Sequence, residues 1–144
     1  MPTTPKNQCI CKIVRDTARS LTNAYDRALA PSGLRTTQYT MLSVLKGQSV
    51  ANVNQLSELL GIDQTTTTRN LNVLEDAGLV SRVPHHDPRV KLMKLTPKGK
   101  QKREIAKERW KEMQHHITSA ISADEWRTFQ KVLQTIEKKC NEWE

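Results

Sequence analysis

Amide, hydroxyl and guanidinium side chains are concentrated in one short stretch, QTTTTRNLN at residues 64–72. These groups suit the major groove of DNA, because Gln and Asn can bond adenine and Thr can meet a thymine methyl group or a phosphate. On a helix most of them fall opposite an apolar face of Thr67, Leu71 and Leu74. The alternative is that the threonines are merely tolerated and serve as caps. We predict a DNA-contacting set: Gln64, Thr65, Thr66, Thr68, Arg69 and Asn72.

A second candidate group lies in PHHDPRVK, residues 84–91. Arginine inserted into a narrow minor groove reads the shape of DNA, and Arg89 stands near the tip of a predicted hairpin. Asp87 is placed to orient it. Lys91 would supply a phosphate contact, which positions the protein without specifying sequence. The alternative is that these are solvated hairpin charges.

The chemistry of enzymes and metal sites is not indicated. The chain has no glycine-rich phosphate loop, no GxSxG and no HExxH motif, so we expect neither an enzyme nor a cofactor. The histidine pairs at 85–86 and 115–116 are adjacent residues, and we expect neighbours on a helix or strand to point apart rather than chelate together, so we expect no metal site. The three cysteines, an odd number, argue against a disulfide framework.

Helical spacing and capping signals predict the elements that position these residues. A first helix runs from Ile10 and stops at Pro31-Ser32-Gly33, and a second is capped by Thr36 or Thr37 and closed at Gly47. Asn52 and Gln55 form a capping box for a third helix, which ends at Gly61. Asp63 caps a fourth helix, residues 64–77, with Gly78 as its stop. The third and fourth helices together make a helix-turn-helix.

The remainder predicts a wing and two long helices. Residues 79–83 and 89–95 read as the strands of a β-hairpin. Thr96 caps a fifth helix, with Pro97 in its first turn, that runs to about Ile121. Ser122 and Glu125 form a capping box for a last helix, whose apolar residues are spaced by three and four as in helices that pack on a partner: Trp126, Phe129, Leu133, Ile136, Cys140 and Trp143.

The predicted fold is α+β, mainly α, with one winged helix-turn-helix domain between dimerisation helices. Residues 1–8 form a flexible tail, 9–34 an N-terminal dimerisation helix, 35–96 the DNA-binding domain and 97–144 the C-terminal dimerisation helices. The 23 basic residues outnumber 15 acidic ones, giving a net charge of +8 that favours a polyanionic partner. No signal-peptide core or membrane span is evident, so we expect a cytoplasmic protein.

The order of these motifs resembles the MarR family of dimeric winged-helix bacterial transcription regulators. The matching strings are NQLSELLG at 54–61, DQTTTTRNLNVLEDAGLV at 63–80 and DPRVKLMKLTPKG at 87–99, within a resemblance that covers residues 10–144. It implies a homodimer on double-stranded DNA, with helix 64–77 in the major groove and the wing at 84–89 in the minor groove. It also implies a repressor of a pseudo-palindromic operator, released by a small phenolic or lipophilic effector. Residues that could line the effector pocket are Tyr39, Met41, Trp110 and His115, although plain core packing is an alternative for them.

A second resemblance, to the organic-hydroperoxide-sensing branch of that family, gives an alternative function in the stress response. It implies that Cys11 is the oxidant-sensing thiol and that Tyr25 bonds its sulfur, while the other tyrosines of that branch are replaced by Arg15 and Thr36. Cys9 is too near Cys11 to pair without strain, so Cys140 of a partner subunit is the better resolving thiol. The cysteines could instead be small core residues. A third possibility is a non-specific nucleic-acid or anionic-membrane binding protein.

Overall fold

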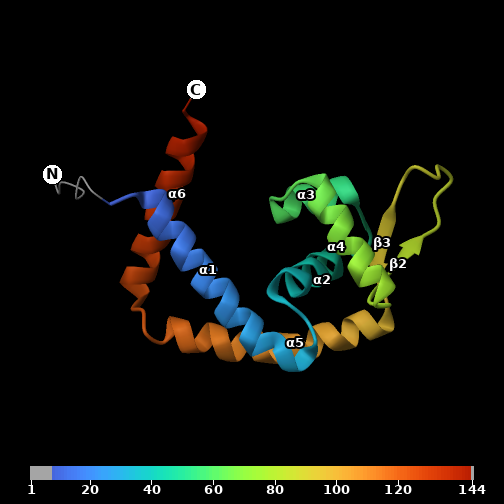
Figure 1. The fold of residues 1–144 in the computed structure, drawn as a ribbon, viewed down its shortest axis with the longest axis horizontal. Coiled ribbons are helices and arrows are strands. Elements are labelled where there is room, and N and C mark those ends of the chain that lie inside the picture. The colour runs from blue at the N-terminus through green and yellow to red at the C-terminus, as the bar shows by residue number, and fades with distance from the viewer. Residues whose placement is uncertain (1–7, 144) are drawn as a thin grey trace. The chain divides into compact units, whose positions relative to one another are not determined.

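A computed structural model describes residues 8–143. It divides into a first unit that ends at Trp110 and a second that begins at Lys111, and each is described by itself. The fold is mainly helical with one small antiparallel sheet, as the sequence predicts (Figure 1). The elements in chain order are α1 (Ile10–Leu29), the 3-10 helix η1 (Ala30–Ser32), α2 (Thr36–Gln48), β1 (Ala51–Asn52), α3 (Val53–Leu60), α4 (Gln64–Asp76), β2 (Val80–Val83), β3 (Leu92–Leu95), α5 (Pro97–Thr118) and α6 (Ala123–Asn141).

The core of the first unit lies where α2, α3 and α4 meet one another and the sheet. Each of these helices turns leucines inward, and the fully buried ones include Leu42, Leu56 and Leu71. The sheet contributes Val80 and Met93 to the same cluster. Burial of each of these side chains contributes roughly 2 kcal/mol to the stability of the fold, because its apolar surface is removed from water. This cluster holds the two helices of the helix-turn-helix in a fixed relation.

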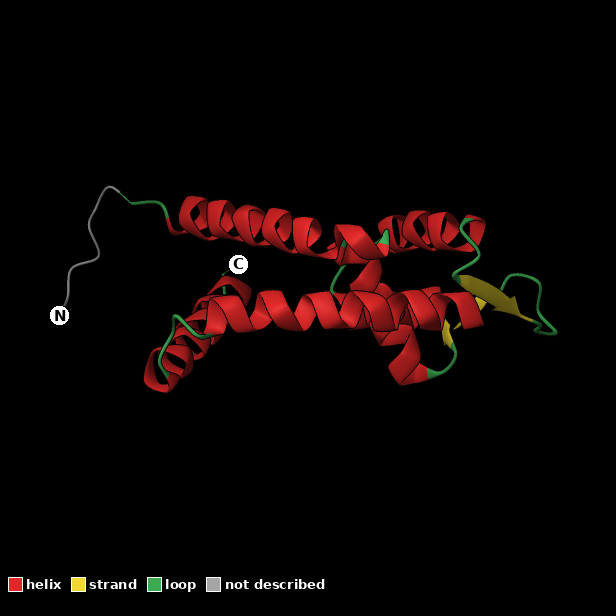
Figure 2. Cartoon of the chain, turned by 90° about the horizontal axis from the view of Figure 1, so that it is seen from below, coloured by secondary structure: helices red, strands yellow, loops and turns green. Residues whose placement is uncertain are grey.

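The sheet has three strands rather than the two that the sequence predicts. Its order is β1-β3-β2, antiparallel throughout, with Val80 opposite Leu95 and Ala51 opposite Met93. Figure 2 draws the strands in yellow among the red helices. The extra strand β1 has only two residues, and the second of them, Asn52, is also the N-cap of α3, so no alternation of apolar and polar residues could reveal it. The hairpin strands β2 and β3 are shorter than predicted.

The start of α2 corrects one predicted cap. The N-cap is Arg35, and neither Thr36 nor Thr37 takes that position. Instead the backbone N–H and the hydroxyl of Thr36 both donate to Oδ1 of Asp26 in α1, each at 2.7 Å. A carboxylate from another helix therefore does the work of the cap. The helix also ends one residue later than predicted, after Gln48, because Gly47 keeps helical geometry and Ser49 takes the positive φ of 62°.

The other predicted caps are confirmed. Asn52 accepts from the N–H of Gln55 at 2.8 Å, Asp63 accepts from the N–H of Thr66 at 2.7 Å, and Thr96 accepts from that of Gly99 at 3.0 Å. Gly61 and Gly78 both take the left-handed conformation that ends α3 and α4. Local sequence rules therefore fix most of the helix boundaries in the first unit.

The start of α5 is fastened to the end of α4 through main-chain oxygens. The Thr96 hydroxyl donates to Gly78 O at 2.6 Å, the Thr96 N–H donates to Leu79 O at 3.1 Å, and Lys98 Nζ donates to Ala77 O at 3.0 Å. Gly99 lies so close to Leu79 that a Cβ there would stand 2.0 Å from Leu79 O. The sequence LTPKG at 95–99 is thus a joint between two helices.

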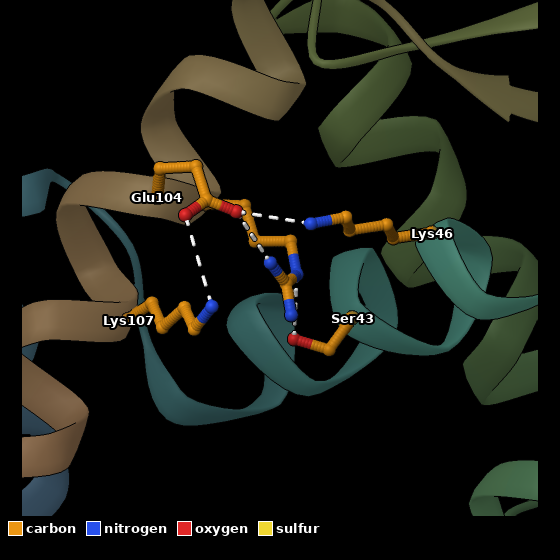
Figure 3. A network of polar contacts seen from close by, with 5 residues as sticks. Ser43, Lys46, Glu104 and Lys107 are labelled. Atoms are coloured by element: carbon orange, nitrogen blue, oxygen red, sulfur yellow. Dashed lines mark hydrogen bonds and ion pairs between the residues drawn. The ribbon is translucent and has the colours of Figure 1, made fainter.

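A polar network also ties α5 to α2 (Figure 3). Glu104 accepts from Lys46 at 3.2 Å and from Arg103 at 2.8 Å, and Arg103 donates to Ser43 Oγ at 3.1 Å. Only 12% of the Arg103 side chain is exposed. Because Lys46 donates a hydrogen bond to Glu104, the pKa of that carboxyl lies below its usual value.

The second unit contains the end of α5 and the whole of α6. The chain leaves α5 at Thr118, earlier than the predicted Ile121. Ser122 and Glu125 form the predicted capping box of α6. No residue of α6 is buried, and several of its large apolar side chains are exposed, among them Trp126, Phe129 and Leu133. Across residues 8–143, none of the helices is long and apolar enough to cross a membrane.

Candidate nucleic-acid interface

The N-terminus of α4 is held by Asp63. Its carboxylate accepts from the N–H and the hydroxyl of Thr66, at 2.7 and 2.8 Å. These bonds, the one from the Thr66 N–H first, lower the pKa of Asp63, so the cap is charged at neutral pH. A charged cap fixes the first turn of the helix that carries the predicted DNA-contacting residues.

The inner face of α4 is fixed to α3 by a buried hydroxyl pair. Thr67 is fully buried, its hydroxyl donates to Asp63 O at 2.9 Å, and it accepts from Ser57 Oγ at 2.8 Å. Leu71 and Leu74 follow on the same face and are also fully buried. With three of its residues fixed on the inner side, α4 has one defined outer face.

That outer face brings together five of the six predicted helix residues. One open depression of the surface is lined by Gln64, Thr65, Thr68, Arg69 and Asn72. Thr66 is not among them. Its hydroxyl is bonded to Asp63, and the residue lines a different cavity together with Thr36, Thr40 and Met41. The position of Thr66 therefore fits the structural role of a cap partner.

Two amides on this face have partners from other elements. Gln64 Nε2 donates to Oδ1 of Asn54, an exposed residue of α3, at 2.8 Å. Lys91 Nζ, from the end of the wing loop, donates to Asn72 Oδ1 at 2.6 Å. Asn54 is not predicted from the sequence as a site residue. The one feature that could have indicated it is its exposed amide near the start of α3, the first helix of the helix-turn-helix. The Lys91 contact spans 19 positions in the chain and joins the wing to α4.

The wing loop holds its arginine in a defined position. Asp87 accepts from the N–H of Arg89 at 2.9 Å and from its Nε and one terminal nitrogen, both at 3.2 Å. The Arg89 side chain is nevertheless 89% exposed. The hydrogen bond from the Arg89 side chain, followed by that from its backbone, lowers the pKa of Asp87. The guanidinium is thus oriented by one carboxylate and still open to a partner.

Most of the positive charge near this candidate interface comes from residues outside α4 and the wing. Residues 63–95 hold five bases (Arg69, Arg82, Arg89, Lys91, Lys94) and four acids (Asp63, Glu75, Asp76, Asp87), a net of +1. Arg82 is further paired with Glu75 at 3.7 Å. The stretch 96–121 holds seven bases and three acids, a net of +4. Attraction to a polyanion therefore depends mostly on residues outside the helix-turn-helix and its wing.

None of the candidate redox residues belongs to α4 or to the wing. Cys9, Cys11 and Cys140 are all exposed free thiols. Cys11 is in the first turn of α1, where Arg15 donates to its sulfur at 3.4 Å. Tyr25 is half-buried further along α1, and burial raises the pKa of its hydroxyl.

The four residues predicted to line an effector pocket are not all gathered at one site. Tyr39 and Trp110 are in ring contact, with centroids 6.3 Å apart, and Arg103 lies 5.9 Å from the centre of the Tyr39 ring. Met41 is fully buried and lines the other cavity, with Thr36 and Thr66. His115 is exposed and belongs to the second unit.

Comparison with known proteins agrees with this architecture. The model of the MarR family matches residues 32–89. YdgJ, an uncharacterised helix-turn-helix transcriptional regulator of Bacillus subtilis, is 28% identical over 113 residues, 78% of this chain and 69% of its own. The transcriptional regulator MosR of Mycobacterium tuberculosis, solved in complex with DNA, superposes with a TM-score of 0.82 at 33% identity, covering 93% of this chain and 97% of its own. A mutant MarR of Escherichia coli with operator DNA shares the fold, with a TM-score of 0.83 at 22% identity over 93% of this chain and 99% of its own.

Proposed function

The chain belongs to the MarR family of DNA-binding transcriptional regulators, and we propose that it is a dimeric repressor of a pseudo-palindromic operator. In this proposal α4 enters the major groove of each half-site, and the wing at 84–89 reaches the minor groove. A small phenolic or lipophilic ligand releases the protein from DNA. The regulators that it resembles are bacterial, so we place its action in the cytoplasm.

The outer face of α4 is the observation that carries the proposal. Five side chains able to bond bases or phosphates lie together there, on a helix whose opposite side is fixed in the core. Arg89 on the wing adds an exposed, oriented guanidinium of the kind that enters narrow minor grooves. MosR, at 33% identity, was solved on DNA with the same fold, which supports DNA as the partner of this chain.

Exposed apolar side chains support the dimer. In α1 they are Ile10, Ile13, Val14 and Leu21, and in α6 they include Phe129, Val132 and Leu133. Apolar surface repeated along two helices is typical of faces that pack against a partner subunit. A second copy of the chain would also supply the second α4 that a two-half-site operator requires.

Sequence-specific binding is the test. The duplex from the promoter beside the protein's own gene is compared with a shuffled duplex of equal composition, at several salt concentrations. We expect the promoter duplex to bind about a thousandfold more tightly or better, with affinity for both duplexes falling as salt rises. Salicylate-like phenols should then release the promoter complex. Equal affinity for both duplexes would favour a non-specific basic binder instead.

A thiol-based release mechanism is the second candidate, and the contact between Arg15 and Cys11 favours it. The guanidinium of Arg15 lies 3.4 Å from an exposed sulfur in the first turn of a helix, and the thiolate is the nucleophilic form of a cysteine. Attack on a hydroperoxide transfers one oxygen to the sulfur and leaves an alcohol, giving a sulfenic acid. Cys140 of a partner subunit, or Cys9, could then displace that oxygen as water and form a disulfide.

Replacing the thiol distinguishes the two release mechanisms. With Cys11→Ser, hydroperoxide should no longer release the promoter duplex, whereas binding in the reduced state should be unchanged. Arg15→Gln keeps the thiol and removes the charge, so release should become slower. Release that persists in Cys11→Ser would eliminate the redox mechanism and leave the small-ligand mechanism standing.

A further inference from the structure

The hydrogen bond between Lys91 and Asn72 constrains how the asparagine can contact DNA. Lysine carries only donors, so the atom that faces its Nζ at 2.6 Å must be the amide oxygen of Asn72. The NH₂ group of Asn72 and the second lone pair of its oxygen are then left for another partner, and the second lone pair lies beside a positive charge. Asn72 is exposed on the outer face of α4, while Lys91 is half-buried. The stem of the lysine is thus held by the wing, and its ammonium group is held over one side of the amide.

This arrangement matters because adenine and guanine present different patterns of hydrogen-bond donors and acceptors in the major groove. Adenine presents an acceptor at N7 and a donor at N6, so an amide reads it with its NH₂ and its oxygen together. Guanine presents two acceptors, N7 and O6, and suits a group that only donates. The Lys91 ammonium takes one of the two lone pairs of the Asn72 oxygen, and its positive charge repels the positively polarised hydrogens of an adenine amino group that approaches the other. Its two remaining N–H bonds add further donors at the same place.

We propose that Asn72 and Lys91 together form a donor-only pair that reads guanine, with Lys91 as the residue that sets this specificity. The proposal rests on the proposed function as an operator-binding regulator. It assigns Lys91 a role beyond a phosphate contact. Base discrimination at one position of the half-site therefore depends on a residue of the wing, outside the recognition helix.

Gln64 provides an internal contrast on the same face. Its NH₂ group donates one hydrogen to Asn54, so its oxygen and its second N–H both stay available. That pattern still matches adenine. The two amides of the outer face therefore have opposite preferences, because Asn72 has a donor as its neighbour and Gln64 has an acceptor.

Selection from a random pool tests the inference. Wild type, Asn72→Ala, Lys91→Met and Lys94→Met are each incubated with duplex DNA whose central window is randomised, and the bound fraction is sequenced. Asn72→Ala identifies the position that Asn72 reads, as the one whose preference disappears. Lys91→Met keeps an unbranched side chain and removes the donors. Lys94→Met removes the same charge from strand β3 and is the matched control.

The expected result is guanine at the Asn72 position in the wild type, favoured over adenine by about tenfold. In Lys91→Met that preference should shift to adenine, while every other position stays the same. Lys94→Met should weaken binding to all sequences alike and keep the guanine. The inference is overturned, and the proposed function retained, if a pseudo-palindrome is selected but Lys91→Met keeps guanine or Asn72→Ala changes no position. If the wild type enriches no sequence at all, the proposed function itself is contradicted.

Discussion

The Arg89 side chain is highly exposed to solvent and is also held in one position by hydrogen bonds, which is unusual for a long side chain. Two hydrogen bonds to Asp87, from Nε and from one terminal nitrogen, hold the guanidinium, and the Arg89 backbone N–H donates a third to the same carboxylate. An arginine ordered before binding loses less conformational entropy when it enters a groove. We therefore expect Asp87 to contribute to DNA affinity by positioning Arg89, although its own carboxylate is not attracted to phosphates.

Replacing this arginine should weaken DNA binding without affecting assembly. We expect Arg89→Ala to lower affinity for the promoter duplex about tenfold or more, because a minor-groove cation is lost. Fluorescence anisotropy measures the affinity and sedimentation the oligomeric state. Arg82→Ala, at an exposed arginine already paired with Glu75, is the control and should have a smaller effect. Equal losses in the two variants would mean that the wing contributes only charge.

Asp63 makes the stability of α4 depend on pH. Its pKa is lower in the folded protein, chiefly through the bond from the Thr66 N–H, so the folded state binds this proton less readily than the unfolded state does. The stabilisation is complete above about pH 4 and is lost as the pH falls through the lowered pKa. Asparagine caps a helix without titrating.

We therefore expect Asp63→Asn to be less stable than wild type at neutral pH and to approach it at acidic pH. Urea denaturation at about pH 7 and about pH 3 measures the difference in the free energy of unfolding. A difference that stays the same at both values would show that the charge of Asp63 contributes nothing. Asp124→Asn is the control. Asp124 is an exposed acid in the first turn of α6, but the N-cap of that helix is Ser122.

Much of the outer face of α4 can be predicted from sequence, because helical periodicity places Gln64, Thr65 and Thr68 on one side. That they contact DNA stays a prediction. The sequence groups Thr66 with Thr65 and Thr68 as a DNA-contacting residue, but its hydroxyl is bonded to the cap residue Asp63. The contact of Lys91 with Asn72 could not be predicted, since it depends on how the wing folds back beside α4.

Among the helices, a cap can be predicted from sequence when the capping residue is within three residues of the N–H group that it bonds. A cap from a distant part of the chain cannot be predicted in this way. The boxes at Asn52 and Ser122 repeat a local pattern, so the sequence reveals them. The start of α2 is served by Asp26, ten positions away in α1. No rule based on neighbouring residues could have rejected Thr36 as a cap.

The joint between α4 and α5 should fail if a methyl group is added at Gly99. Its Cβ would stand 2.0 Å from Leu79 O, a main-chain atom that cannot move without shifting a strand. We expect Gly99→Ala to destabilise the protein by roughly 1–3 kcal/mol, as overpacking does. Urea denaturation measures the change in the free energy of unfolding.

Gly47→Ala is the matched control for that substitution. Gly47 is helical and a Cβ there would meet nothing within 4 Å, so alanine should stabilise α2 by up to about 1 kcal/mol. Opposite signs for the two glycines are therefore expected. If Gly99→Ala were neutral or stabilising, the close approach of α5 to Leu79 would be contradicted.

For the whole molecule, assembly is the property that the exposed apolar residues predict. We expect Phe129→Asp, which places a charge at a half-exposed apolar position of α6, to weaken the dimer and, with it, binding to a two-half-site duplex. Sedimentation at low protein concentration measures the dimer fraction. Gln130→Asp adds the same charge at the neighbouring exposed polar position and should leave the dimer intact. A dimer unaffected by either change would exclude this face of α6 from the interface.

The fastening of α4 to α5 has a consequence for how such a regulator could acquire a new target. Its hydrogen bonds end on the main-chain oxygens at positions 77, 78 and 79, which every amino acid possesses. The side chains of the outer face take no part in it. The outer-face residues of segment 64–72 could therefore be exchanged for those of another regulator, or diverge after gene duplication, while the buried Thr67 and Leu71 and this joint stay the same. The outer face of α4 can thus vary, whereas Gly99 belongs to the contact between α5 and Leu79 that stays constant.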